Sequence, residues 1–249
     1  MSEKLEFRNS ENKKLIGILN SNNSKKIVIL GHGIYSSKDS LTYELLEKYL
    51  VEAGLASFRF DLSGHGESEG TQEEITLSNN IDDMNSAIKF IKEKGFEKIG
   101  LLGVSWSGEV DLIVASKSKD VCALGLRCPE TDYYNGLKFK LENNLAEYDS
   151  SKEKIIITAR TSGKKRIIKK ENYEDAKLYN IFEIAPNINL PVLIIQGDKD
   201  LSSPVENSEK VHSLLPKSEL IIIKGADHKF TGFIEESMKP FRDFFLKYL

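Results

Sequence analysis

The sequence is poor in several features that define whole classes of protein. Its 249 residues include only two cysteines, Cys122 and Cys128, which do not form a CxxC pair, so a disulfide scaffold and a zinc site are disfavoured. The net charge is only −3, too small for the basic footprint of a nucleic-acid-binding protein. No apolar run approaches the ~18 residues of a membrane-spanning helix. We therefore expect neither a nucleic-acid partner nor a membrane span.

The first residues, MSEKLEFRNSENKK, lack the apolar core of a signal peptide. Together with the scarcity of cysteine, this predicts a cytoplasmic protein. Hydrophobic residues make up 40% of the chain and charged residues 29%, which is ordinary for a globular domain. The length is sufficient for one large α/β domain.

Apolar runs typical of buried strands alternate with segments of helical spacing along most of the chain. After a hairpin at 4–8 and 15–19, we expect strands at 26–30, 56–60, 98–102, 121–126, 192–196 and 220–223. The expected helices are 41–53, 81–91, 106–117, 205–215 and 235–249. This alternation predicts an α/β protein with a mostly parallel, twisted sheet and helices on both faces.

The alternation breaks between residues 130 and 189, which are rich in Lys, Glu, Asn and Tyr. We interpret this segment as a cap, a small insertion over one end of the sheet, and residues 1–129 and 190–249 as the core. Within the cap, a hairpin is expected from strands at 155–158 and 166–168 around 161–164.

The cap combines aromatic and basic side chains. The aromatic ones suit an aromatic or amphipathic acyl group: Tyr133, Tyr134, Phe139, Tyr148, Tyr173 and Tyr179. A basic cluster could attract an anionic substrate, but it is more typical of a solvated hairpin face: Lys164, Lys165, Arg166, Lys169 and Lys170.

Five of the predicted strands end in glycine-containing turns that carry reactive side chains. These turns read GHGI (31–34), DLSGHGES (61–68), GVSWSG (103–108), GDKD (197–200) and GADH (225–228). Because ligands bind at the carboxyl ends of the strands in an open parallel sheet, we expect the turns to meet at one edge. They would bring a serine, several acids and histidines together.

The GVSWSG turn raises two interpretations of Ser105. Small-x-Ser-x-small after an apolar run presents a nucleophilic serine on a sharp strand-to-helix turn, and Ser107 is still small where glycine is usual. Such a turn would aim the backbone N–H of Trp106 at the reacting carbonyl. Taken alone, the motif is equally consistent with a helix N-cap, which serine performs well.

The full set of motifs resembles the α/β-hydrolase fold, in which serine, acid and histidine follow in this order, each after its own strand. The short cap, the HG-x loop and the GADHKF run are most similar to the small bacterial feruloyl/cinnamoyl-type esterases. The resemblance implies a serine hydrolase that cleaves a small-molecule carboxylic ester through an acyl-enzyme. It implies neither a metal nor an organic cofactor.

The resemblance also assigns roles to individual residues. Ser105 is the expected nucleophile and His228 the expected base. Asp200, three residues after the glycine of its turn, is the expected acid, and Asp198 and Asp227 are the alternatives. The oxyanion hole is assigned to the backbone N–H groups of two residues, Ile34 and Trp106.

The remaining candidate side chains have structural interpretations. His32, His65 and the DLSGHGES turn are expected to support loops, with Asp61 and Ser68 fixing hydrogen bonds within that turn. His212 falls within a predicted helix. Cys128 is expected to be a packed thiol.

Three rival functions share these motifs. A thioesterase and a prolyl-oligopeptidase-like peptidase use the same three catalytic groups with a different pocket. A non-catalytic α/β-hydrolase would serve as a binding module, but such proteins usually lack one of the three groups, and all are present here.

Overall fold

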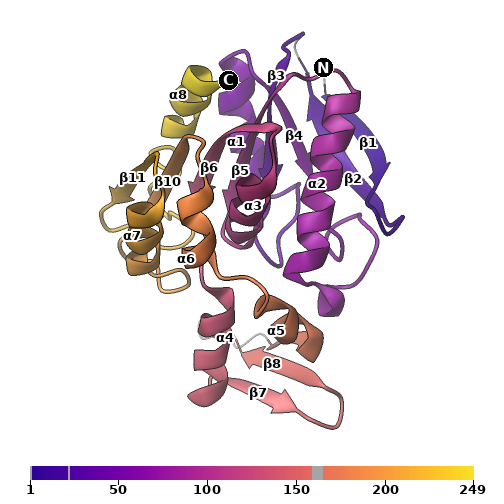
Figure 1. Ribbon diagram of the computed structural model, residues 1–249, viewed down its shortest axis with the longest axis vertical. Coiled ribbons are helices and arrows are strands. Elements are labelled where there is room, and N and C mark those ends of the chain that lie inside the picture. Colours follow the sequence, from indigo (N-terminus) through magenta and orange to yellow (C-terminus); the bar gives the residue numbers. More distant parts are fainter. Residues whose placement is uncertain (1, 22, 159–164) are drawn as a thin grey trace.

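The computed structural model describes residues 2–21, 23–158 and 165–249 and contains a large and a small sheet (Figure 1). The large sheet is built from β1 (Ser2–Arg8), β2 (Lys14–Asn20), β3 (Lys26–Gly31), β4 (Ala56–Phe60), β5 (Lys98–Val104), β6 (Val121–Arg127), β10 (Val192–Gly197) and β11 (Ser218–Ile223). Their spatial order is β1-β2-β4-β3-β5-β6-β10-β11. The pairs β1–β2 and β2–β4 are antiparallel, and the other neighbours are parallel.

Helices cover both faces of this sheet. One face carries α1 (Leu41–Glu52) and α8 (Lys239–Tyr248), and the other carries α2 (Leu77–Glu93), α3 (Trp106–Lys117), α6 (Ile181–Ile184) and α7 (Val205–Leu214). Strand β3 shows the alternation: Ile27 and Ile29 pack in the cluster with α2 and α3, whereas Val28 packs with α1 and α8. Burial on both faces explains why these strands are continuous apolar runs.

The predicted mostly parallel sheet with helices on both faces is confirmed. Two helices begin four residues away from their predicted starts, and the other boundaries of the predicted helices agree within two residues. Helix α2 begins four residues earlier, at Leu77, where the Thr76 side chain caps it by accepting a hydrogen bond from the Asn79 N–H. Helix α8 begins only at Lys239, with Pro240 in its first turn. Proline has no backbone N–H, but a residue in the first turn needs none, because its N–H would have no acceptor within the helix.

The cap holds a second, three-stranded sheet that projects beyond the large one (Figure 1). Its elements are α4 (Tyr133–Glu142), β7 (Ala146–Asp149), β8 (Lys154–Thr158), β9 (Lys165–Lys169) and α5 (Lys170–Ala176). Strands β8 and β9 pair as predicted, whereas the expected turn at 161–164, with Lys164, lies outside the described residues. Helix α4 and strand β7 were not expected from the sequence.

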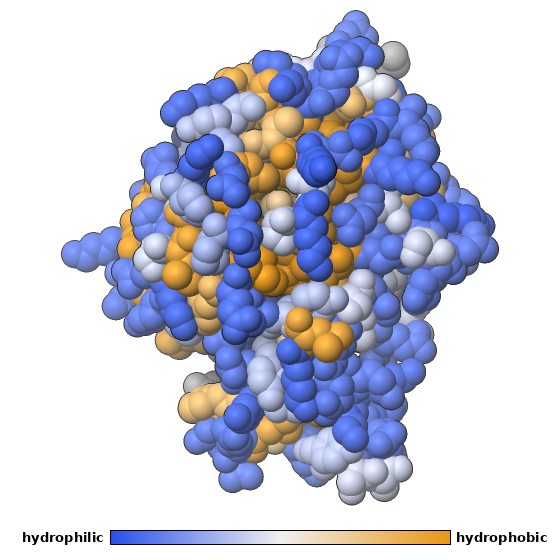
Figure 2. Space-filling view, in the orientation of Figure 1, coloured by the Kyte–Doolittle hydropathy of each residue, from blue (hydrophilic) through white to orange (hydrophobic). Residues whose placement is uncertain are grey.

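The two ends of the insertion pack differently. Leu137, Ile155 and Ile168 form a small apolar cluster within the cap. Ile181 of α6 and Ala185 of the following 3₁₀ helix η2 (Ala185–Asn187) are buried instead in the large apolar cluster of the core. On the face drawn in Figure 2, the part of the molecule formed by the cap is mainly hydrophilic.

Across the described residues, no helix combines the length and apolar character needed to cross a bilayer.

Candidate active site

Ser105 stands on a strained turn between β5 and α3. Its φ of 53° and ψ of −114° are unusual for a residue with a side chain. Ser105 occupies the N-cap position of α3, but its side chain makes no capping hydrogen bond. Its Oγ lies 3.1 Å from Nε2 of His228 instead. The geometry therefore favours the nucleophile interpretation over the N-cap.

Close backbone packing explains the small residues around Ser105. A Cβ on Gly103 would lie 2.6 Å from the Ser107 carbonyl oxygen, and a Cβ on Gly31 would lie 2.7 Å from the Ser107 Cβ. Ser107 is fully buried, and its Oγ accepts a 2.8 Å hydrogen bond from the Val104 N–H. The serine thus meets the size limit of the turn and also satisfies a buried backbone donor.

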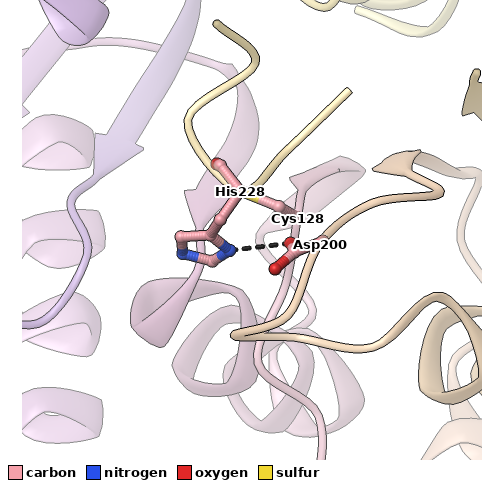
Figure 3. Close-up of side chains that lie close together, drawn as sticks. All are labelled: Cys128, Asp200 and His228. Carbon is pink, nitrogen blue, oxygen red and sulfur yellow. Dashed lines mark hydrogen bonds and ion pairs between the residues drawn. The ribbon is translucent and has the colours of Figure 1, made fainter. Parts of the chain in front are cut away.

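His228 and Asp200 complete a continuous hydrogen-bonded chain with Ser105. Figure 3 shows the contact between His228 and Asp200. His228 Nδ1 lies 2.7 Å from Asp200 Oδ2. An ionised carboxylate only accepts hydrogen bonds, so the ring carries its proton on Nδ1 and directs the lone pair of Nε2 toward Ser105. The structure thus brings together the three residues that the sequence singled out.

Asp200 is itself held firmly in the turn after β10. Its Oδ1 accepts the backbone N–H groups of Ser202 at 2.8 Å and Ser203 at 2.9 Å. The Gln196 side-chain amide donates to Oδ2 at 3.0 Å. With these donors in place, the carboxylate has one orientation in which to receive His228.

Burial disfavours the charged form of His228, but the hydrogen bonds with Asp200 and Cys128 favour it more strongly. Together they raise the pKa of His228 above its ordinary value. The Asp200 carboxylate therefore both orients the ring and stabilises the imidazolium that forms when His228 accepts a proton.

The two alternative acids are engaged within their own turns. Asp198 Oδ1 accepts the Gly225 N–H at 2.6 Å and so joins the turn after β10 to the turn after β11. Asp227 accepts hydrogen bonds from the N–H groups of Lys229 and Thr231 and shapes the loop that carries His228. The structure places Asp200, rather than either alternative, against the imidazole.

The loop after β3 lies directly beside the serine. A Cβ on Gly33 would lie 3.5 Å from the Ser105 Cβ and 3.9 Å from its Oγ. Within the part of the chain that the structure describes, the backbone N–H groups of Ile34 and Trp106 have no hydrogen-bond acceptor. The indole of Trp106 is buried and donates to Asn80 Oδ1 at 2.8 Å, which fixes this end of the site.

The other histidines lie where structural roles were expected. His32 accepts the Leu62 N–H at Nε2 and lies 3.0 Å from the Gly33 carbonyl at Nδ1, so it joins the loops after β3 and β4. Burial lowers the pKa of His32 to about 3, so its ring is neutral. His212 lies on α7 and contacts the Ser218 hydroxyl.

The DLSGHGES turn is built around a buried ammonium group that the sequence did not reveal. Lys38 is only 1% exposed, and its Nζ contacts Asp39 at 2.7 Å, Asp61 at 3.0 Å and Glu67 at 2.6 Å. Asp61 also accepts the N–H groups of Lys38 and Glu67, and Ser68 Oγ donates to the Asp61 carbonyl. The expected turn hydrogen bonds of Asp61 and Ser68 are therefore present.

Arg127, at the end of β6, is a site residue that the sequence did not indicate. Its carbonyl accepts the Ser105 N–H at 3.1 Å. Its guanidinium lies 4.2 Å from the ring centroid of Phe230 and 3.4 Å from the Lys229 carbonyl. Arg127 thus connects the nucleophile turn to the histidine loop. Examining the end of every predicted strand would have singled it out.

Cys128 lies closer to the proposed chemistry than a packed thiol requires. It is 1% exposed and has a φ of 41°, a second strained residue at this edge. Its N–H donates to the Ile195 carbonyl of β10, and its Sγ lies 3.4 Å from the His228 carbonyl oxygen. The thiol is packed, as expected, but against the histidine itself.

The cap approaches the site through two aromatic contacts. The Tyr133 ring lies edge-on to the Trp106 indole with centroids 4.8 Å apart. The Arg166 guanidinium stacks 4.2 Å above the ring of Tyr35, which follows Ile34 in the loop after β3. Among the other described residues of the basic cluster, Lys165 is exposed, Lys169 pairs with Glu74, and Lys170 pairs with Glu153.

A cavity of about 950 Å³ opens within the cap. It is lined mainly by α4, β7, β8 and α5, with Leu141, Tyr148, Ile155 and Tyr173 among its apolar walls. Its lining includes none of Ser105, Asp200 and His228. We therefore centre the site on the hydrogen-bonded chain of these three residues and not on this cavity.

A family model described as "Serine aminopeptidase, S33" matches residues 22–147, which is more than half of the chain. Est1E from Butyrivibrio proteoclasticus, solved with bound ferulic acid, has a TM-score of 0.85 at 22% identity, with 98% of each chain covered. The Pyrococcus furiosus esterase Pf2001 has a TM-score of 0.76 at 22% identity, covering 100% of this chain and 93% of that one. These likenesses show an α/β-hydrolase fold, as predicted.

A curated relative, the uncharacterized protein YfhR of Salmonella typhimurium, is 28% identical over 209 residues, or 82% of this chain. The match covers 65% of that relative, and 58% of its counterpart from Salmonella typhi. The chain thus spans less than two thirds of the length of the curated relatives it matches.

Proposed function

The chain belongs to the serine aminopeptidase S33 family of α/β-hydrolases, and from that premise we propose that it cleaves small carboxylic esters through an acyl-enzyme intermediate. The observation that carries the proposal is the chain of hydrogen bonds from Ser105 Oγ through His228 to Asp200, at 3.1 Å and 2.7 Å. A serine hydroxyl needs such a base, because it is a weak nucleophile at neutral pH.

In the proposed reaction, Ser105 Oγ attacks the ester carbonyl carbon while its proton passes to His228 Nε2. The resulting oxyanion accepts hydrogen bonds from the N–H groups of Ile34 and Trp106, and each such donor is worth about 3–4 kcal/mol. His228 then protonates the departing alcohol. In the second half-reaction it removes a proton from water, which attacks the acyl-enzyme and releases the acid.

For the acyl group, we propose that hydroxycinnamoyl-type esters are among the substrates. Two observations support this choice. The chain shares its fold over nearly its whole length with Est1E, which was solved with ferulic acid. Tyr133 and Tyr35 lie at the junction between the site and the cap, where planar aromatic groups would stack favourably.

A peptidase is the second candidate, because the matching family is described as a serine aminopeptidase. The same three catalytic groups would serve it. The two candidates differ in the leaving group, which is an alcohol in one case and an amine in the other.

Two experiments test the proposal. A fluorophosphonate probe should label the purified protein at Ser105, and a Ser105→Ala variant should not be labelled. Absence of labelling in the native protein would favour a non-catalytic binding module. Matched ester, thioester and anilide substrates with the same acyl group then identify the leaving group, and we expect the ester to have the highest kcat/KM. A dominant anilide activity would select the peptidase.

A further inference from the structure

The proposed base and acid belong to a second, overlapping cluster that includes a thiol. Cys128, Asp200 and His228 each offer one ligand atom, and these atoms all lie within 4.8 Å of one another (Figure 3). They come from three separate segments, the ends of β6 and β10 and the loop after β11.

Thiolate, imidazole and carboxylate are the ligands that zinc prefers. With zinc–ligand distances of about 2.0–2.3 Å, the ligand atoms of a tetrahedral site lie roughly 3.3–3.8 Å apart. No pair of ligand atoms is more than 4.8 Å apart, so the wider pairs must contract, whereas Nδ1 of His228 and Oδ2 of Asp200, now 2.7 Å apart, must move slightly apart. One thiolate and one carboxylate would also balance the charge of a divalent cation, which a buried site demands.

We propose that Cys128, Asp200 and His228 form an inhibitory site for a thiophilic divalent cation such as Zn²⁺ or Cd²⁺. Three protein ligands leave the fourth position of a tetrahedral ion open. The ion would enter along the His228 side chain, which is 28% exposed, because the Asp200 side chain has no exposed surface. The inhibitory consequence rests on the proposed function, but binding of the ion does not.

Binding would invert the tautomer that hydrolysis needs. The Cys128 thiol loses its proton to solvent and forms a bond from sulfur to the metal. His228 Nδ1 loses the proton that it donates to Asp200 and bonds to the metal through its lone pair, while a proton from solvent occupies Nε2. Asp200 exchanges a hydrogen bond for a metal bond. With Nε2 protonated, His228 can no longer accept the proton of Ser105.

Cadmium binding can be measured on the intact protein without any substrate, from the ultraviolet charge-transfer absorption of a cadmium–thiolate bond. Cys122 is a matched control, because it lies on β6, the strand that Cys128 directly follows, and is only partly buried. We expect the band in the native protein and in the Cys122→Ser and Ser105→Ala variants. It should be absent from both Cys128→Ser and Cys128→Ala. Two substitutions are used so that the test still holds if one of the variants does not fold. A band that survives in the Cys128 variants, or that disappears with Cys122, would overturn the site.

Zinc inhibition of hydrolysis tests the consequence. Each variant is compared with its own rate without metal, since Cys128 contacts the His228 carbonyl. Cys128→Ser should raise the zinc concentration for half-inhibition at least tenfold, Cys122→Ser should leave it unchanged, and a chelator should restore activity. Equal inhibition of the two variants would contradict the inhibitory mechanism. A protein that hydrolyses nothing but shows the Cys128-dependent cadmium band would refute the proposed function alone.

Discussion

The strand ends of the core and the cap are stabilised by different interactions. Ser105 and Asp200 follow β5 and β10, strands that are buried along almost their whole length. Among the described residues of the cap, three fully buried apolar side chains form its own cluster: Leu137, Ile155 and Ile168. Ion pairs tie it to the core, between Lys154 and Glu73 at 2.6 Å and between Lys169 and Glu74 at 3.2 Å.

This difference separates the chemistry from the selection of substrate. A catalytic geometry must be held within a fraction of an ångström, and a close-packed sheet provides that rigidity. The contacts between cap and core include partly exposed ion pairs, each worth only about 0–1 kcal/mol, beside the packing of Tyr133 on Trp106 and of Ala176 in the core cluster. Changes at the strand ends should therefore lower kcat, whereas changes at the cap contacts should alter substrate binding.

Among the changes that leave Ser105 in place, the largest effect is expected from Asp200→Asn. Asp200 Oδ2 now accepts hydrogen bonds from both His228 Nδ1 and the Gln196 side-chain amide. An asparagine amide group at this position would donate instead, so the His228 ring would favour the tautomer with its proton on Nε2. We expect kcat to fall on the order of 10⁴-fold. Asp198→Asn, in the same turn, is the control and should cost far less. Steady-state kinetics of both variants decide between the two acids, and the reverse order would mean that Asp198 is the acid.

Ser107→Val should damage the nucleophile turn. Its branched methyl groups would press on Gly31, where the packing already leaves no space, and the Val104 N–H would lose its acceptor. Overpacking of this kind costs about 1–3 kcal/mol of unfolding free energy. We expect kcat/KM to fall about 100-fold, because Ser105 is displaced. Ser107→Ala keeps the volume small and should lose only the hydrogen bond, about 1 kcal/mol. A fully active Ser107→Val enzyme would disprove the packing argument.

Asp111 offers a stability test inside the core, on α3. The residue is fully buried, and within the described structure neither of its carboxyl oxygens has a hydrogen-bond partner. Burial raises the pKa of Asp111 well above its ordinary value, so folding favours the neutral acid. The stability contributed by this group is complete below the unfolded-state pKa of about 4 and is lost as the pH rises through the raised, folded-state pKa.

Asp111→Asn removes this titration without changing the shape of the side chain. We expect the variant to gain about 1–3 kcal/mol of unfolding free energy at pH 8 and almost nothing near pH 4. Asp243→Asn, at an exposed position, serves as the control and should show no such trend. Denaturation midpoints across this pH range measure the difference. An Asp111→Asn variant that is less stable at pH 8 would show that the carboxylate has a partner.

The smallest effect concerns the cap. Combining Lys154→Ala with Lys169→Ala removes both ion pairs to the core and should cost less than about 2 kcal/mol of unfolding free energy. We expect KM to rise a few-fold while kcat stays nearly constant, with the difference shrinking at high salt. Lys177→Ala, which breaks a pair inside α5, should leave KM unchanged. A parallel loss of kcat would mean that the cap takes part in the chemistry.

The sequence predicted the strand ends better than the cap for a physical reason. Strands buried on both faces appear in the sequence as long apolar runs, and the turns after them are marked by glycines. Helix α4 buries only Leu137 of its ten residues and contains Gly136, so it has no apolar period to detect. Strand β7, with the sequence AEYD, likewise shows no apolar pattern that would predict a strand.

Within the site, the residues that escaped prediction act through long-range contacts. The carbonyl of Arg127 matters because the fold brings the Ser105 N–H to it. From the sequence alone, Lys38 would be taken for an exposed lysine, whereas in the structure its ammonium group is buried among three carboxylates. Such roles depend on tertiary distances, which a pattern of residue types does not encode.

The central claim is that Ser105 is the nucleophile of a hydrolase. Its most direct test is the turnover of a chromogenic ester by Ser105→Ala. The control is Ser116→Ala, because Ser116 lies on the helix that Ser105 precedes and, within the described residues, its hydroxyl donates only to the Ile113 carbonyl. We predict that Ser105→Ala lowers kcat on the order of 10⁴–10⁶-fold with an unchanged denaturation midpoint, while Ser116→Ala remains active. Near-normal turnover by a folded Ser105→Ala protein would contradict the account.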